Sequence, residues 1–448
     1  MASWRFAIAT QTTRVSLSPA GRPQRPARGG GPVEPWRFVR LLSAPHRLGF
    51  SVGAAMLSAG ALWWLAVLAW RLGPGLSVSW AVGSAHAHAL LMIFSFMPMF
   101  FAGFLFTAGP RWLALPAVDA RVLLPVAFAW LTGWGAFLAG AHAGAPLAAV
   151  GLAIVASAWS LFTTRLVQMV RAGRAADRTH LRVIAAACGI GAAALWLAAS
   201  GIALGEPLLV QIALSAGLWW FLAPVFAAAS HRMVPFFDVA APRLDERHPN
   251  WLLWTWLAVL AVQPPLAAGL SEHDAATLAT AVLDGAAALA VGGLALRWAR
   301  VQNLRIHLLA MLHVGFVWLG IALALQALAA WLAWSGHGTP EPRLAALHAL
   351  GMGSFASTQL AFVTRVSAGQ DGRAHSVDGL AWALFLGLQA AVALRLAATA
   401  LPAWQPGWRL GHEALLLAAA AAWAAVMLAW SARYVRWYGR PRSDGRPG

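Results

Sequence analysis

The stretch SAHAHALLMIFSFMPMFFAGFLFTAGPRW, residues Ser84 to Trp112, decides the fold of this chain. It begins with His86 and His88 and then runs without a charged residue as far as Arg111. At a rise of ~1.5 Å per residue, about twenty such residues in a helix cross the ~30 Å hydrocarbon core of a bilayer. Because an imidazole is costly to keep at the edge of that core, we expect the histidines to have a function.

The composition is that of an integral membrane protein. Of the 448 residues, 60% are hydrophobic and only 10% are charged, whereas about 25% of a soluble protein is charged. The net charge is +17, and the basic residues are all arginine. Most arginines lie in short loops between apolar runs, so we interpret them as topology signals that contact anionic lipid and not as a nucleic-acid surface.

The apolar runs and the arginines together predict the topology. With the N-terminus inside, every arginine except Arg71, Arg343, Arg395 and Arg409 lies on the cytoplasmic side, as the positive-inside rule requires. We therefore predict an all-α, polytopic bundle of twelve transmembrane helices with both termini cytoplasmic, in the inner membrane of a bacterium. The expected helices are 48–70, 84–108, 121–140, 145–168, 182–203, 207–230, 250–270, 275–296, 306–333, 343–364, 377–401 and 411–433.

The remaining segments are short tails. Residues 1–45 are rich in Arg, Pro and Gly, which predicts a disordered, basic cytoplasmic tail and not a cleaved signal peptide. Residues 46–437 then form the membrane domain, and 438–448 form a short cytoplasmic C-terminal tail.

Cys188 is the one cysteine, so no disulfide forms within a chain. No GxxxxGK[ST] phosphate loop occurs, which argues against an ATP-driven machine.

Two of the expected helices carry a similar histidine motif. His88-Ala-Leu-Leu-Met in 84–108 matches His348-Ala-Leu-Gly-Met in 343–364 at four of five positions. Both helices run inward, so the two imidazoles enter the bundle at similar depth, as a bis-histidine haem site requires. His86 and His88 are two residues apart and therefore lie about 200° apart around a helix, so they cannot both face one metal. We assign His88 as axial ligand and His86 as its hydrogen-bonding partner or a copper ligand.

Other polar residues inside the membrane are further candidates. His313 lies about 9 Å into the helix 306–333, and His231 and His307 lie near the cytoplasmic surface; all three are candidate metal ligands. A hydrogen bond that joins helices is the structural alternative for each of these histidines. Asp284 is the one carboxylate well inside an apolar run. It is a candidate proton relay, and a protonated or paired structural acid is the alternative.

Eight different short motifs are spread along nearly the whole chain. They are HAH (86–88), GFLFTA (103–108), PRW (110–112), RMVPFF (232–237), LHVG (312–315), HAL (348–350), TRVS (364–367) and RPRSDG (440–445). In this order and spacing the chain resembles the NnrS family of bacterial membrane proteins. The resemblance implies twelve helices, haem and copper as cofactors, and a role in the response to nitric oxide.

The chain departs from the family pattern at two positions. Ala89 stands directly after the second histidine of the HAH motif, where the family usually has an acidic residue. Gln370 stands in the loop after 343–364, where the family tends to have a histidine. A carboxylate beside a ligand histidine orients it or handles protons, so its replacement puts the family's metal chemistry in doubt for this chain.

Three functions are compatible with these residues. The leading hypothesis is a haem- and copper-binding membrane protein that handles nitric oxide or protects against nitrosative stress, with histidines of the second and tenth helices as ligands. The alternative is a cofactor-free secondary transporter or channel in which Asp284 couples proton movement. A regulatory or assembly partner that binds haem without turnover is a third. The sequence identifies no electron donor.

Overall fold

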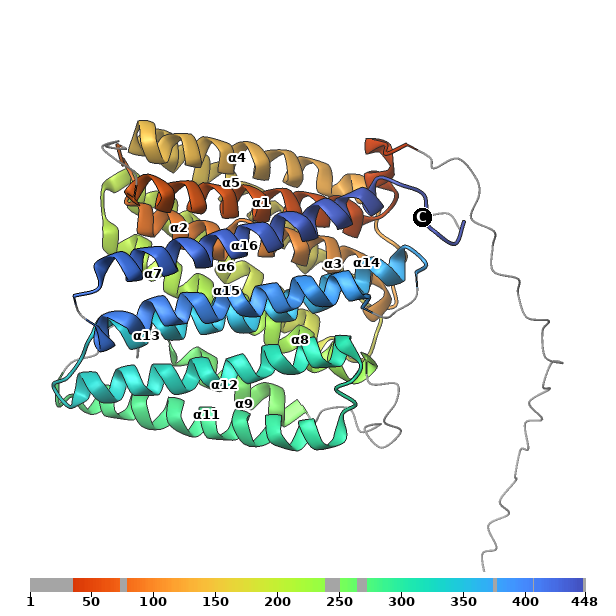
Figure 1. Cartoon of the computed structure of the whole chain (residues 1–448). Helices are drawn as coiled ribbons and strands as arrows, with labels where there is room; N and C mark the ends of the chain where they lie inside the picture. Colours follow the sequence, from red (N-terminus) through yellow and green to blue (C-terminus); the bar gives the residue numbers. More distant parts are fainter. Residues whose placement is uncertain are drawn as a thin grey trace, which may run out of the picture. The chain divides into compact units, whose positions relative to one another are not determined.

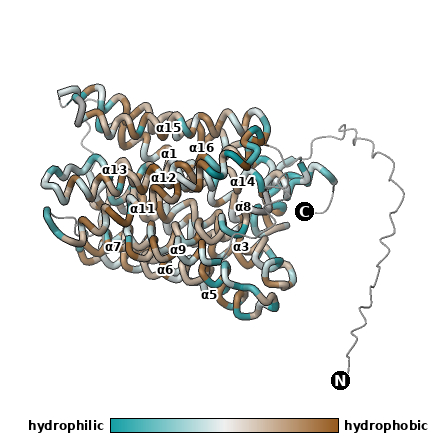
Figure 2. The backbone as a smooth tube through the Cα atoms, turned by 90° about the horizontal axis from the view of Figure 1, so that it is seen from below, coloured by the Kyte–Doolittle hydropathy of each residue, from teal (hydrophilic) through white to brown (hydrophobic). Residues whose placement is uncertain are grey.

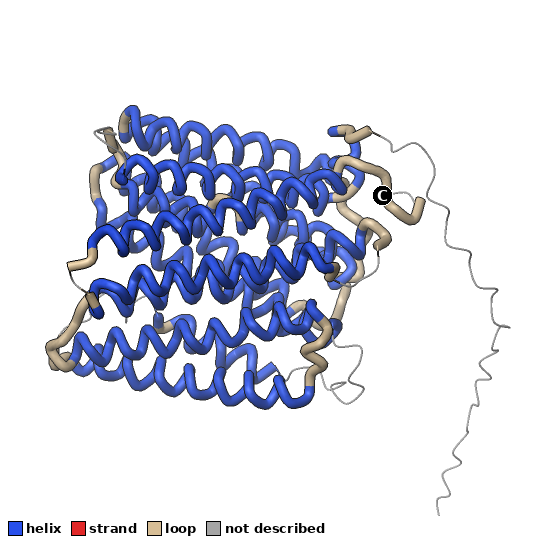
Figure 3. The backbone as a smooth tube through the Cα atoms, in the orientation of Figure 1, coloured by secondary structure: helices blue, strands red, loops and turns tan. Residues whose placement is uncertain are grey.

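The computed structural model describes residues 35–72, 79–237, 250–263, 272–373, 377–405 and 407–445. Trp36–Gly448 forms one compact unit. The described residues form helices and no strand (Figure 3), so the prediction of an all-α bundle is confirmed. Most of the expected N-terminal tail lies outside the described residues, and its described part includes a short 3-10 helix, Phe38–Ser43.

The helices of this unit run side by side along a common direction (Figure 1). A helix satisfies all its backbone hydrogen bonds internally, which is the condition for a segment that lies in hydrocarbon. In chain order the elements are η1 (Phe38–Ser43), α1 (Pro45–Leu72), α2 (Ser84–Phe94), α3 (Met97–Trp112), η2 (Ala120–Leu123), α4 (Leu124–Ala143), α5 (Ala145–Ala172), α6 (Thr179–Leu204), α7 (Pro207–Ala216), η3 (Gly217–Leu222), α8 (Ala223–Phe237), α9 (Asn250–Ala261), α11 (Ala275–Val301), α12 (His307–Trp334), α13 (Pro340–His348), η4 (Ala349–Ala356), α14 (Ser357–Gln370), α15 (Gly379–Trp404) and α16 (Arg409–Tyr438).

The predicted count of twelve transmembrane helices is not confirmed. Ten helices in the described part of the chain are long and apolar enough to cross a membrane. The expected span 250–270 is represented by α9, which ends at Ala261 before a segment outside the described residues. The expected span 343–364 lies in the helical run 340–370, which is interrupted by the π-helix η4 and carries Ser, Thr and Gln side chains among its apolar ones.

The two ends of the bundle are distinguished by the contacts between its loops. The Arg37 N–H donates to the Gly439 carbonyl at 2.9 Å, so both described ends of the chain meet at one end of the bundle, here called the near end. At the opposite, far end, the His273 N–H donates to the Trp334 carbonyl at 3.1 Å. The run 340–370 begins at the far end, where α13 is labelled in Figure 1, and reaches the near end through α14.

Hydropathy follows the same axis. Figure 2 shows hydrophobic residues along the helices and more hydrophilic ones gathered toward the ends. The interior is aromatic, with Trp130, Trp134 and Trp159 fully buried.

Glycines let two helices of the bundle approach closely. Where α1 crosses α3, a Cβ on Gly49 would lie 2.6 Å from the Cα of Gly103, so only glycine permits this close approach of two membrane helices.

The span 84–108, expected as one helix, is broken between α2 (Ser84–Phe94) and α3 (Met97–Trp112). Pro98 has no N–H to donate, and the N–H of Met99 bonds to the Phe96 carbonyl at 3.2 Å. The Ser95 carbonyl instead accepts a hydrogen bond from Trp130 Nε1 at 2.7 Å. A proline near the start of a helix disrupts the preceding turn in this way, and the indole satisfies the exposed carbonyl.

Candidate functional site

His88 lies in the first turns of α2 at the far end of the bundle. Its imidazole stacks on the indole of Trp64 of α1, with 3.9 Å between ring centroids and 21° between planes. The Nδ1 atom is buried and makes no hydrogen bond within the described part of the chain. A ring held by stacking, with an unpaired buried nitrogen, is suited to bond a metal.

His348 is the last residue of α13, and its tautomer follows from its hydrogen bond. Nδ1 lies 2.8 Å from the Leu344 carbonyl, one turn earlier. A carbonyl only accepts, so Nδ1 carries the proton and the lone pair is on Nε2. Metal-binding histidines are typically oriented by this kind of bond to a backbone carbonyl. The π-helix η4 starts at the next residue, and π-helical turns are frequent at functional sites.

The structure brings these two histidines together from different helices. The imidazoles of His88 and His348 lie within electrostatic range of each other, and the Arg395 guanidinium lies within range of both. Arg71 is also within range of His88; it donates to the hydroxyl of Ser84. We call His88, His348, Trp64, Arg71 and Arg395 the far-end site. Its two cations make it suited to a ligand with negative groups.

His86, the third histidine predicted at this site, takes no part in the stacking of His88 on Trp64 or in the hydrogen bond of His348 to Leu344. His86 is half-buried at the start of α2, where a Cβ on Gly83 would lie 3.8 Å from its Nδ1. Among the residues that the structure describes, no three His, Cys, Asp or Glu side chains gather as metal ligands. A haem iron takes only its axial ligands from the protein, so two histidines suffice for haem. A copper site built from three such side chains is not found in the described ranges.

The near end of the bundle holds a second pair of histidines. His180 Nε2 and His231 Nδ1 are 2.9 Å apart, and the His180 ring is buried. His231 had been assigned as a candidate ligand from sequence, whereas His180 had not. The signal for His180 was its place in the first turn of α6, at the same membrane depth as His231. Beside them the Arg232 guanidinium lies over the Trp112 ring at 4.6 Å.

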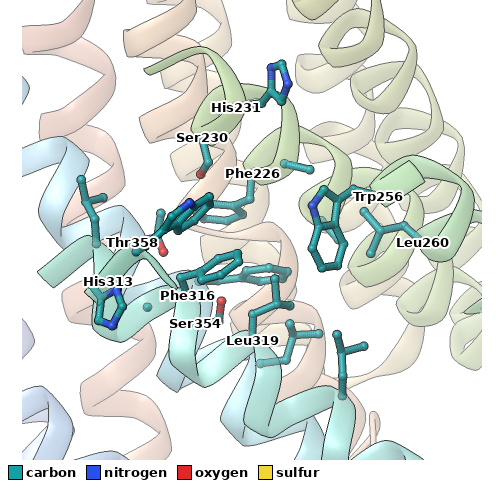
Figure 4. Close-up of a pocket in the computed structure, with 18 of the residues that line it drawn as sticks. Phe226, Ser230, His231, Trp256, Leu260, His313, Phe316, Leu319, Ser354 and Thr358 are labelled. Atoms are coloured by element: carbon teal, nitrogen blue, oxygen red, sulfur yellow. The ribbon is translucent and has the colours of Figure 1, made fainter. Parts of the chain in front are cut away.

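His231 and His313 line one apolar cavity of about 140 Å3 between α8, α9, α11, α12 and the run 340–370. Figure 4 shows the two histidines on opposite sides of this cavity, with Phe226 and Phe316 between them. The Nδ1 atom of His313 is buried without a hydrogen bond in the described structure. We call this space the near-end cavity.

His307, the third near-end candidate, does not line that cavity. Its ring stacks on Trp382 of α15 with 4.5 Å between centroids and 9° between planes. Its Nδ1 lies 3.4 Å from the Val377 carbonyl. These contacts give it a packing role between α12 and α15, and its assignment as a metal ligand stays a prediction.

Asp284 lies fully buried on α11, away from both histidine sites. Its Oδ1 accepts a hydrogen bond of 2.6 Å from the Gln263 amide, and Gln326 of α12 donates to the Gln263 side-chain oxygen. Oδ2 is buried without a hydrogen bond to any described residue. Two neutral amides supply hydrogen bonds but no positive charge, so the network joins helices and leaves one carboxyl oxygen for a proton.

Sequence reasoning missed three residues of the far-end site, namely Arg71, Arg395 and Trp64. Arg71 and Arg395 are two of the four arginines on the side opposite the charge-rich loops, and that exception was an available signal. Trp64 is one of 26 tryptophans, and its stacking on His88 depends on how α1 packs against α2. No sequence pattern distinguished it.

Comparison with known proteins gives one family. The family model described as NnrS protein matches residues 40–442, which is nearly the whole chain. The match includes both histidine sites and every described helix of the bundle except the first residues of η1. No curated protein matches the chain.

Proposed function

Since this chain belongs to the NnrS family, we propose that it is a haem-binding membrane protein that handles nitric oxide, with His88 and His348 as the residues that would hold the haem iron. The family is generally associated with haem and copper. The observation that supports the proposal is that the imidazoles of His88 in α2 and His348 in α13 lie within electrostatic range of each other at the far end.

The donor atoms of the far-end site fit a haem. His348 keeps its Nδ1 proton on the Leu344 carbonyl and therefore presents Nε2 to a metal. His88 has a buried Nδ1 without a hydrogen bond in the described part of the chain, and Trp64 fixes the plane of its ring. Arg71 and Arg395 supply positive charge for the two propionates of a haem.

The protein's own residues would set the chemistry at this site. A bound haem would supply an iron that can bind nitric oxide in place of one of the two histidines; nitric oxide is a small apolar molecule that dissolves in the bilayer. Arg395 and Arg71 would hold the propionates, and their positive charge would favour the ferrous over the ferric state of the haem iron. Trp64 would exclude water from one face of the His88 imidazole, since it stacks on that face.

Copper remains an expectation from the family. The sequence predicts His86 to be either a hydrogen-bonding partner of His88 or a copper ligand, and the described residues offer no group of three His, Cys, Asp or Glu side chains. We therefore derive no step through copper.

The membrane location is supported by the fold. The ten long apolar helices among the described residues make the chain a multi-pass membrane protein. We place it in a bacterial inner membrane with the arginine-rich near end in the cytoplasm, which puts the far-end site in the outer half of the bilayer. Its partners are then lipid and nitric oxide or a related small molecule.

The test is an optical and metal analysis of the detergent-purified full chain, with and without nitric oxide under reducing conditions. We expect a Soret band, about one iron per chain, and a shift of the band on addition of nitric oxide. Protein that is folded and free of iron after expression with added haem precursor would contradict the proposal.

The buried network of Asp284 favours one second candidate, a transporter or channel coupled to protons. Its neutral partners Gln263 and Gln326 leave the carboxyl with room for a proton inside the membrane. Metal-free protein reconstituted in liposomes would then carry protons across the membrane together with a transported solute, which a pH-sensitive dye inside the liposomes would report. Asp284→Asn, which preserves the shape and removes the titration, would abolish this flux.

A further inference from the structure

The near-end cavity has the size of a single six-membered ring. Its volume is about 140 Å3, and its walls include Phe226, Trp256 and Phe316. An apolar cavity of roughly 150 Å3 holds a benzene molecule. The space therefore fits a planar ring and is far too small for a tetrapyrrole, which separates it from the haem site proposed at the far end.

Polar side chains lie on opposite sides of this ring-sized space. Ser230 and His231 of α8 lie on one side, and His313 of α12 and Ser354 of η4 lie on the other (Figure 4). The Nδ1 atom of His313 is buried and has no hydrogen bond within the described ranges. A buried polar atom of this kind calls for a partner, and the cavity is where a partner has room.

A glycine and a π-helix shape the wall of the cavity on the His313 side. A Cβ on Gly315 would lie 2.5 Å from the hydroxyl oxygen of Thr358, so glycine lets α12 lie directly against α14. The π-helix η4 places Ser354 on the same wall. Phe226 of α8 stacks on Phe355 of η4 with 4.6 Å between centroids and 7° between planes, so the two walls meet in a flat apolar surface.

One wall of the cavity is a helix with exposed aromatic side chains. This helix is α9, whose Trp256 lines the cavity. On the same helix Trp251 and Trp254 are 66% and 54% exposed, as expected of aromatic side chains that face lipid. A ligand that enters past α9 therefore arrives from the bilayer, and an apolar tail on it would remain there.

We propose that the near-end cavity binds the head group of a membrane quinone or quinol. Such a head group is a flat ring with one oxygen on each of two opposite edges, and it carries a long apolar tail. One oxygen would bond to His313 and Ser354, and the other to Ser230 and to Nε2 of His231, whose Nδ1 already pairs with His180. A fatty acid has a polar group at one end only, so it would engage the polar side chains of one wall and not those of the other. The inference concerns binding and does not rest on the far-end haem site.

The test is a titration of the full chain in lipid nanodiscs with decylubiquinone, followed by quenching of tryptophan fluorescence. His313→Leu removes the hydrogen bond, and Ala227→Phe fills the cavity from α8, where Ala227 is part of its wall. His307→Leu is the matched control, because His307 lies on the same helix but stacks on Trp382 outside the cavity. We expect saturable binding that weakens about tenfold or more in the first two variants and is unchanged in the control.

Equal affinity in all three variants, or quenching that only follows partition into the lipid, would overturn the proposal. Equally tight competition by decanoic acid would also overturn it, since the site would then be a groove for any acyl chain. The Soret band and the melting temperature of each variant are recorded alongside. A His313→Leu protein with normal values of both shows that lost quinone binding is not lost folding or lost haem.

Discussion

The imidazole of His88 and the indole of Trp64 stack face to face, 3.9 Å apart at their centroids, where α1 and α2 meet at the far end of the bundle. Trp64 also has the Arg71 guanidinium 5.8 Å from its ring centroid. The stack fixes the orientation of a proposed metal ligand by packing, without a hydrogen bond.

Trp64→Leu removes this stack and keeps an apolar side chain. We expect haem to remain bound but to dissociate about 2- to 10-fold faster, since an aromatic pair contributes roughly 0.5–1.5 kcal/mol beyond its buried area. The measurement is haem transfer to an excess of apomyoglobin. Trp63→Leu is the control, because the neighbouring indole contacts His142 and not His88. Equal dissociation rates for both variants would show that the stack has no role.

Arg395→Met removes a cation near both proposed ligands. Positive charge next to a haem destabilises the ferric state, so its loss is expected to lower the reduction potential and weaken haem binding. A spectroelectrochemical titration measures the potential. Arg409→Met serves as control, because Arg409 also lies at the far end but is exposed and paired with Glu413. A potential that is the same in both variants would place Arg395 outside the site.

Gly49 is expected to be essential to the contact between α1 and α3. The Cβ of Gly49→Ala would lie 2.6 Å from the Gly103 Cα and 2.8 Å from the Met99 carbonyl oxygen, and neither backbone atom can move alone. Overpacking of this kind costs roughly 1–3 kcal/mol, which should appear as a lower Tm in detergent. In Gly135→Ala the new Cβ meets nothing within 4 Å, so this variant should be neutral or more stable.

The Arg433 guanidinium holds the pKa of the Asp378 carboxyl below its usual range, where this residue caps α15 at the near end. The folded pKa is depressed, so the stabilising effect is present above the unfolded pKa of ~3.9 and is lost as the pH falls through the folded pKa. Asp378→Asn keeps the cap to the Ala381 N–H and loses the charge. Its Tm should be below that of the parent protein at pH 7, and the gap should close in acid. A gap independent of pH would contradict this.

The sequence predicts most of the helix positions because helices that lie in hydrocarbon must be long and apolar. The expected run 145–168 lies within α5, and 275–296 lies within α11. The break at Ser95–Phe96 was not expected, because it needs both Pro98 and the indole of Trp130 to satisfy the exposed carbonyl. The count of twelve is not confirmed for two different reasons: α9 ends at Ala261 before a segment outside the described residues, and the run 340–370 carries Ser, Thr and Gln among its apolar side chains.

The histidine sites were predictable only in part, because some of their contacts depend on how helices distant in sequence pack together. The shared motif of His88 and His348 indicated that the two imidazoles enter the bundle at similar depth, and the structure places them within range of each other. The contacts of His180 and Arg395 depend on packing between helices distant in sequence. A single sequence carries no direct signal for such contacts.

The central claim, that imidazoles from α2 and α13 bind one haem, is tested most directly by the Soret band of three purified variants. His88→Ala and His348→Ala should each lose or strongly shift the band while they keep the helical circular dichroism of the parent chain. His86→Ala, two residues before the proposed ligand, should keep both. A full Soret band in His88→Ala and in His348→Ala would contradict the claim.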